Sequence, residues 1–167
     1  VQYLSKLTNT SYLKTSEITM GEPYMRLERG EVTFKEYVED ISAMFPNGNR
    51  IDGDDLRDIW MNSKIGEMPA VSLLDDLLTN YSVWVISNTT ESHIKSLEPQ
   101  FTFLEKISGI ITSERAGVHK PHPNIFQFAL AEASCDVTSA LFIDDSYANI
   151  ESAENLGIVS HHYTRFD

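Results

Sequence analysis

The chain has 167 residues, of which 41% are hydrophobic, enough for one ordinary domain or for a core with a small second lobe. Its formal net charge of −12 argues against nucleic acid as a general partner, since phosphate backbones attract surfaces rich in lysine and arginine. No apolar run approaches the ~20 residues that span a bilayer, and no signal-peptide pattern opens the chain. A single cysteine, Cys135, excludes an internal disulfide framework and indicates a reducing compartment, so we expect a cytoplasmic protein.

Residues 1–66 are predicted to form a small lobe of short helices without a strand. The clearest helix begins with a capping-box pattern at 33–36, and the apolar residues behind it recur at helical spacing. A turn is predicted at 46–49, because proline, glycine and asparagine cluster there. Asp52 or Asp54 then starts a further helix. We expect this section to be a small helical lobe rather than a core of its own.

From residue 67 onward, the chain alternates between helical patterns and short apolar runs rich in β-branched residues. Repeated strand–helix–strand units imply a parallel sheet with helices on its faces, so we predict an α/β core over 67–167. The predicted strands lie at 83–86, 107–112 (interrupted by Gly109), 140–143 and 158–163. The predicted helices lie at 69–78, 90–97, 122–130 and 147–156.

The third of these strands ends abruptly at two adjacent carboxylates, Asp144 and Asp145, and a helical pattern follows. A buried parallel strand delivers the groups at its carboxyl end to the crevice where α/β sheets bind their ligands. Neighbouring carboxylates repel each other unless a cation lies near, so this pair indicates a hard metal ion or a lysine. Taken alone, the pattern is equally consistent with Asp145 or Ser146 capping the next helix.

Two other segments carry polar groups that could reach the same crevice. Ser87 and Asn88 follow the first strand and can bind an anionic oxygen with the help of free backbone N–H groups, although turn and cap roles are the common alternative. Lys120 lies in a segment stiffened by Pro121 and Pro123. A fixed ammonium can balance both a carboxylate pair and a phosphate, whereas a lysine exposed to solvent is the alternative.

The order and spacing of these segments resemble the haloacid dehalogenase-like hydrolase superfamily. The stretches 83–89, 117–126 and 141–150 are similar to its second, third and fourth motifs, and the helical lobe resembles its small cap through 27–33. The subgroup that contains the amino-terminal phosphatase domain of soluble epoxide hydrolases is the most similar in character. The resemblance implies a Rossmann-like parallel sheet as the core, with the amino-terminal lobe as a cap domain.

The resemblance also implies a Mg²⁺-dependent phosphoryl-transfer site that acts on a small phosphorylated molecule. Asp145 would bind Mg²⁺ directly, and Asp144 would act on the metal through water or by orienting Lys120. Lys120 would hold the phosphate and the carboxylate of the nucleophile, and Asn149 would support the acidic loop. The phosphate oxygens would be bound by Ser87, Asn88 and Lys120.

One part of the superfamily pattern does not occur in the sequence. Its first motif, an apolar strand ending in Asp-x-Asp or Asp-x-Gly-Gly, should precede the cap and supply the aspartate that becomes phosphorylated. In the superfamily this strand lies between those that end here at Ser87 and Asp144. We expect either that the protein continues upstream of Val1, which we favour, or that it is a catalytically inactive relative with a binding or scaffold role. A haloacid dehalogenase is disfavoured, because the metal-free dehalogenases of this superfamily lack the Asp-Asp pair.

Four side chains of the amino-terminal lobe are further candidates, because cap residues can contact a substrate when a cap closes. They are Arg26, Arg29, Trp60 and Lys64. Roles in packing or in contact with solvent are the alternative for all four.

Overall fold

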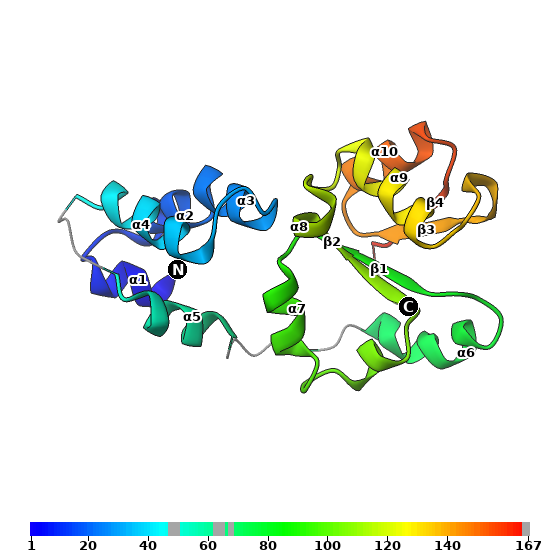
Figure 1. Cartoon of the computed structure of the whole chain (residues 1–167), viewed down its shortest axis with the longest axis horizontal. Coiled ribbons are helices and arrows are strands. Elements are labelled where there is room, and N and C mark those ends of the chain that lie inside the picture. Colours follow the sequence, from blue (N-terminus) through cyan, green and yellow to red (C-terminus); the bar gives the residue numbers. More distant parts are fainter. Residues whose placement is uncertain (47–50, 62–65, 67–68, 165–167) are drawn as a thin grey trace. The chain divides into compact units, whose positions relative to one another are not determined.

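The computed structural model describes residues 1–46, 51–61, 66 and 69–164 of the chain (Figure 1). The chain forms two compact units, Val1–Lys64 and Ile65–Asp167, each with its own hydrophobic core. The expectation that the first lobe has no core of its own is therefore wrong, because its short helices bury apolar side chains against one another. The α/β class predicted from the sequence is confirmed, with helices in both units and parallel strands in the second. Among the described residues, no helix is long and apolar enough to cross a membrane.

The first unit is built from short helices, and its described residues contain no strand. These helices are α1 (Gln2–Leu7), α2 (Tyr12–Thr19), α3 (Glu22–Glu28), α4 (Phe34–Met44) and α5 (Gly53–Met61). The capping box predicted at the start of α4 is present, because Thr33 Oγ1 accepts from Glu36 N at 3.2 Å and the Glu36 carboxylate accepts from Thr33 N at 2.7 Å. Behind it, Tyr37 and Ile41 are buried in the core of the unit. The turn predicted at 46–49 lies, apart from its first residue, outside the described residues.

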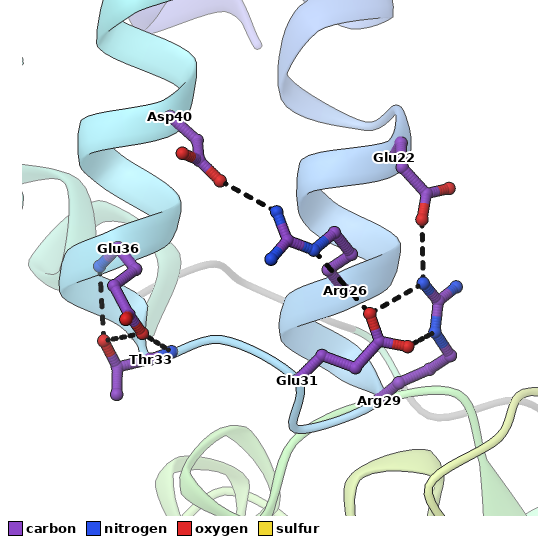
Figure 2. A network of polar contacts seen from close by, with 7 residues as sticks. All are labelled: Glu22, Arg26, Arg29, Glu31, Thr33, Glu36 and Asp40. Carbon is purple, nitrogen blue, oxygen red and sulfur yellow. Dashed lines mark hydrogen bonds and ion pairs between the residues drawn. The ribbon is translucent and has the colours of Figure 1, made fainter.

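An ion-pair network joins α3 to the segment before α4 and to α4 itself (Figure 2). Arg29 donates to Glu31 through Nε at 2.6 Å and to Glu22 at 2.8 Å. Arg26 lies 3.6 Å from Glu31 and donates to Asp40 of α4 at 3.3 Å. Both arginines, which the sequence offers as substrate contacts, are therefore engaged by carboxylates of their own unit.

The second unit alternates strands and helices in the order predicted for an α/β core. Its strands are β1 (Trp84–Ser87), β2 (Gly109–Thr112), β3 (Leu141–Asp144) and β4 (Val159–His162). Its helices are α6 (Leu74–Leu78), α7 (Glu91–Leu97), α8 (Ser113–Ala116), α9 (Pro123–Glu132) and α10 (Tyr147–Asn155), with 3₁₀ helices at Pro69–Leu73, Thr102–Glu105 and Val137–Ser139. The continuous helix predicted at 69–78 is therefore wrong in its first half, which is a 3₁₀ helix.

Parallel pairing, predicted from the strand–helix–strand order, joins β1 to β2 and β3 to β4. Trp84 lies opposite Gly109 in the first pair, and Leu141 lies opposite Val159 in the second. Within the described residues these pairs are two separate sheets, so β1 and β3 each keep one edge without a strand partner there. Such an edge presents backbone N–H and C=O groups that a further strand can bind.

Gly109 does not interrupt the second strand, as the sequence suggested, but is its first residue. The Trp84 ring on the neighbouring strand lies directly against it. A Cβ atom on residue 109 would come within 2.3 Å of that ring, closer than any side chain tolerates. The glycine therefore provides the space that the cross-strand tryptophan occupies.

The two faces of the β3–β4 sheet have different surroundings. Phe142 points toward α9, where its ring meets that of Phe126 edge-on with centroids 5.0 Å apart. Leu141 and Ile143 point to the other face, because side chains alternate along a strand, and they remain 64% and 51% exposed. Val159 of β4 is 62% exposed beside them. One face is thus packed, whereas the other is open among the described residues.

Candidate active site

The carboxyl ends of β1 and β3 lead into the segments that carry the predicted site residues. Ser87 is the last residue of β1, and Asp144 is the last residue of β3. Lys120 comes from the segment between α8 and α9. Hydrogen bonds from Asn88 to Lys120 and from Lys120 to Asp144 join the three segments. The structure therefore brings together two strand ends and the segment of Lys120, which lie far apart in the sequence.

Lys120 and Asp144 form an ion pair that is largely removed from solvent. The Lys120 ammonium donates to Asp144 Oδ2 at 2.6 Å, and the two side chains are only 13% and 7% exposed. The same ammonium lies 5.8 Å from the centroid of the Phe142 ring, within reach of a cation–π contact. Removing either charge would leave the other buried without its partner, which is costly.

The second oxygen of Asp144 is also fully engaged. Asp144 Oδ1 accepts from the backbone N–H of Ser146 at 2.8 Å and from the side-chain amide of Asn149 at 2.9 Å. Burial alone would raise the pKa of Asp144, but the hydrogen bonds from Lys120, Ser146 and Asn149 outweigh it and hold that pKa below its usual value. Asp144 is therefore an ionised carboxylate that orients its neighbours, and Asn149 lies where a support of the acidic loop is expected.

Asp145 differs from its neighbour in both exposure and contacts. Its side chain is exposed, and its carboxylate accepts no hydrogen bond from the described residues. Its backbone oxygen accepts from His162 Nε2 at 3.0 Å, which ties this loop to the end of β4. Ser146 is the N-cap residue of α10, but its side chain makes no capping hydrogen bond. The simple capping role that the sequence left open is therefore not realised by Ser146.

The chemistry of these oxygens fits a magnesium ion that takes few ligands from this chain. Mg²⁺ is usually held by one or two carboxylates, with water and phosphate oxygens completing its shell. Asp145 offers one open carboxylate, whereas Asp144 has no unengaged oxygen. Across the described ranges there is no group of three or more His, Cys, Asp or Glu side chains that would enclose a metal. The donor set thus suits Mg²⁺ shared with a substrate better than a closed structural metal site.

Asn88 contacts the main chain of Lys120 with both ends of its side-chain amide. Asn88 Nδ2 donates to Lys120 O at 3.0 Å, and Asn88 Oδ1 accepts from Lys120 N at 2.8 Å. Ser87, one residue earlier, is half-buried at the strand end. An amide has two N–H donors, so this double contact leaves one donor of Asn88 for another partner.

Sequence reasoning missed the part that α8 takes in fixing the loop after β1. Ser113 is fully buried, and its hydroxyl accepts from Thr89 N at 2.9 Å and donates to Thr89 O at 3.2 Å. The Glu114 carboxylate accepts from Glu91 N at 2.6 Å, at the first turn of α7. In return, the Thr112 hydroxyl donates to the Glu91 carboxylate at 2.5 Å. The starts of α7 and α8 are therefore hydrogen-bonded to each other and hold the loop that carries Asn88.

The candidates in the first unit have contacts that fit structural roles. The Trp60 ring packs against Tyr24 and Phe34, with centroids 5.6 and 5.7 Å apart. Arg26 and Arg29 belong to the network of Figure 2. The remaining candidate, Lys64, lies outside the described residues.

The chain is similar to known proteins over most of its length. The sequence profile of the haloacid dehalogenase-like hydrolases matches residues 53–162. Among solved structures, a HAD family enzyme of Bacteroides thetaiotaomicron superimposes with a TM-score of 0.79 at 24% identity, covering 95% of this chain and 81% of that one. The same enzyme in complex with magnesium and inorganic phosphate gives a TM-score of 0.72 at 25% identity, covering 90% of this chain and 85% of that chain.

More distant structures share the fold. A HAD-like family hydrolase of Porphyromonas gingivalis gives a TM-score of 0.73 at 22% identity, covering 89% of this chain and 77% of that chain. The L-2-haloacid dehalogenase of Xanthobacter autotrophicus, with chloropropionic acid covalently bound, gives a TM-score of 0.67 at 16% identity. The match covers 99% of this chain and 66% of that chain.

Proposed function

This chain belongs to the haloacid dehalogenase-like hydrolase family, and from that premise we propose that it is a Mg²⁺-dependent phosphatase of small phosphorylated molecules. The family predicted from the sequence is confirmed, and the α/β core of parallel strands has the fold of HAD enzymes. In this proposal the first unit is the cap that admits the substrate, and the enzyme works in the cytoplasm.

The observation that carries the proposal is the pairing of a buried Lys120–Asp144 contact with an open Asp145 carboxylate at the next position. A phosphatase needs a fixed cation for the phosphate and a metal that neutralises its remaining charge. Lys120 is fixed by Asp144, while Asp145 remains available for Mg²⁺. Complexes of the similar Bacteroides enzyme with magnesium and inorganic phosphate support this choice of metal and ligand.

The substrate phosphate would lie between the ends of β1 and β3. Lys120 would bind one phosphate oxygen through its ammonium, and the Ser87 hydroxyl would bind another. Asn88 retains one amide N–H that its contact with Lys120 does not use. Asn149 would keep the Asp144 carboxylate oriented, so that the Lys120 ammonium stays in place.

The nucleophile in this proposal is an aspartate supplied by residues upstream of Val1. The partnerless edges of β1 and β3 among the described residues support a further strand between them that carries this aspartate. Its carboxylate oxygen would form a bond to phosphorus while the bond to the leaving oxygen breaks, and that oxygen would take up a proton from solvent. Water would then attack phosphorus and release a proton to solvent, while the bond to the aspartate breaks, its carboxylate is restored and inorganic phosphate is released.

Magnesium, when bound, would neutralise the charge of the phosphate oxygens and reduce their repulsion of the attacking carboxylate. Asp145 would bind it directly, and Asp144 would contribute through Lys120 and through its own negative charge. The proposal is tested by assaying hydrolysis of p-nitrophenyl phosphate by the full-length protein with Mg²⁺ and with EDTA. We expect turnover that EDTA abolishes, and an equal rate in both conditions would contradict the role of the metal.

A further inference from the structure

Asn88 makes a two-point contact with a single residue that lies 32 positions further along the chain. Its amide N–H donates to Lys120 O at 3.0 Å, while its amide oxygen accepts from Lys120 N at 2.8 Å. The orientation of the amide is fixed by chemistry, because a backbone N–H can only donate and a backbone C=O can only accept. Both main-chain groups of Lys120 are thereby satisfied by one side chain.

The main chain at Lys120 has few other means of support. Lys120 lies between α8 and α9, outside any helix or strand, and the next residue, Pro121, has no N–H to donate. Its side chain is held at the far end by Asp144, at 2.6 Å. Lys120 is therefore fixed at two points, by the residue after β1 at its backbone and by the last residue of β3 at its ammonium.

We infer that Asn88 is a positioning residue, which holds the Lys120 main chain so that the Lys120 ammonium is presented to Asp144 and to the phosphate. This inference deepens the proposed function, and it differs from the direct phosphate contact that the sequence motif implies for Asn88. The continuous series Asn88–Lys120–Asp144–Asn149 links the ends of β1 and β3 through side chains. Those strands belong to separate sheets among the described residues, so this series is their polar connection at the site.

The first test measures the Lys120 amine itself and needs no enzymatic activity. The full-length protein is trace-labelled with an amine-reactive ester, and the labelling rate of each lysine is read by mass spectrometry. In Asn88→Ala we expect the Lys120 rate to rise roughly fivefold or more, the factor that corresponds to losing one hydrogen bond. The rates of Lys95 and Lys106, in the same unit, should not change. Asn155→Ala, an exposed asparagine on α10, is the matched control and should leave all three rates as in the wild type.

Unchanged labelling of Lys120 in Asn88→Ala would overturn the inference. If all three lysines label faster together, the variant has lost its fold. Asn88→Ser, which keeps a polar group at this exposed position, then makes the same comparison.

The second test separates positioning from direct phosphate contact by equilibrium binding of inorganic phosphate in the presence of Mg²⁺. Asn88→Ala should weaken binding several-fold in the wild-type background. It should have no effect in a Lys120→Met, Asp144→Asn background, where no charge is left buried alone, because Asn88 then has no ammonium to position. The same loss in both backgrounds would assign Asn88 to the phosphate and overturn the inference. If the wild type binds no phosphate, the proposed function fails, and the labelling result alone decides the role of Asn88.

Discussion

The Lys120 ammonium and the Asp144 carboxylate lie 2.6 Å apart with exposed fractions of only 13% and 7%. A second lysine of the same unit, Lys106, pairs with Asp75 at 2.7 Å, but these side chains are 51% and 76% exposed. The two pairs have the same charges and nearly the same distance, so they differ chiefly in their contact with water. Because the first pair is buried, loss of one partner would leave an unpaired charge in the interior, whereas solvent screens the charges of the second pair.

This difference predicts unequal costs for two identical substitutions. Lys120→Met should lower the free energy of unfolding by about 3 kcal/mol, because it leaves the Asp144 charge buried. Lys106→Met should change it by less than about 1 kcal/mol. Urea unfolding followed by Trp84 fluorescence in a Trp60→Phe background reports on the second unit alone. Equal costs would show that the Lys120–Asp144 pair is not effectively buried.

Asp145 is predicted to bind the metal without supporting the fold. Asp145→Ala should weaken Mg²⁺ binding at least tenfold in a calorimetric titration, because the carboxylate proposed to bind the metal directly is lost. Its unfolding free energy should stay within about 0.5 kcal/mol of the wild type, as for other surface changes. Glu154→Ala, an exposed carboxylate on α10, is the control and should alter neither quantity. Unchanged Mg²⁺ affinity in Asp145→Ala would remove this residue from the metal site.

Gly109 is predicted to be intolerant of even one methyl group. In Gly109→Ala the new Cβ would meet the Trp84 ring at 2.3 Å, so β1 and β2 must separate or the ring must turn. We expect a loss of about 2 kcal/mol, typical of overpacking. Gly53→Ala, whose Cβ would lie 3.7 Å from Val38, should be neutral or slightly stabilising at the start of α5. Equal changes in the midpoint of thermal unfolding in Gly109→Ala and Gly53→Ala would contradict the close approach of the Trp84 ring to residue 109.

Glu28 is predicted to make the first unit less stable as the pH rises. Burial raises the pKa of Glu28 to about 7, although its hydrogen bond with Tyr24 acts in the opposite direction. Its stabilising contribution is therefore fully present below its ordinary pKa of 4.5 and is lost as the pH rises through about 7. Between pH 5 and pH 8 we expect a loss on the order of 1–3 kcal/mol.

Thermal unfolding of a Trp84→Phe protein, followed by Trp60 fluorescence, measures this loss in the first unit. Glu28→Gln should flatten the pH dependence, because the amide cannot ionise. Glu39→Gln, an exposed carboxylate on α4, should retain it. A steep pH dependence that survives in Glu28→Gln would assign the effect to another group.

Local signals in the sequence were sufficient for most elements of the fold. The capping box at Thr33 and the proline at the start of α9 report on contacts within four residues, and both are present in the structure. The helix α8 was missed because four residues carry no apolar period. Its signals were Thr112, which caps its first turn, and Gly117, which ends it at a φ of 69°.

Contacts between segments that are distant in the sequence could not be predicted from local sequence patterns. Gly109 was predicted to interrupt its strand, because nothing in the neighbouring sequence shows that Trp84 lies opposite it. The sequence placed Asn88 at the site, but its contact with Lys120 depends on how two segments meet in three dimensions. Asp144 is hydrogen-bonded and shielded from solvent, whereas Asp145 is exposed. This difference depends on the tertiary structure, so two adjacent aspartates in the sequence do not reveal it.

The most direct test of the central claim is the steady-state hydrolysis of p-nitrophenyl phosphate by the full-length protein across a Mg²⁺ titration, with Asp145→Ala and Glu154→Ala measured in parallel. The proposed phosphatase predicts turnover that saturates with Mg²⁺ in the wild type and in Glu154→Ala, with at least a hundredfold lower kcat/KM in Asp145→Ala. Undiminished turnover in Asp145→Ala, or no turnover by the folded wild type at any Mg²⁺ concentration, would contradict it.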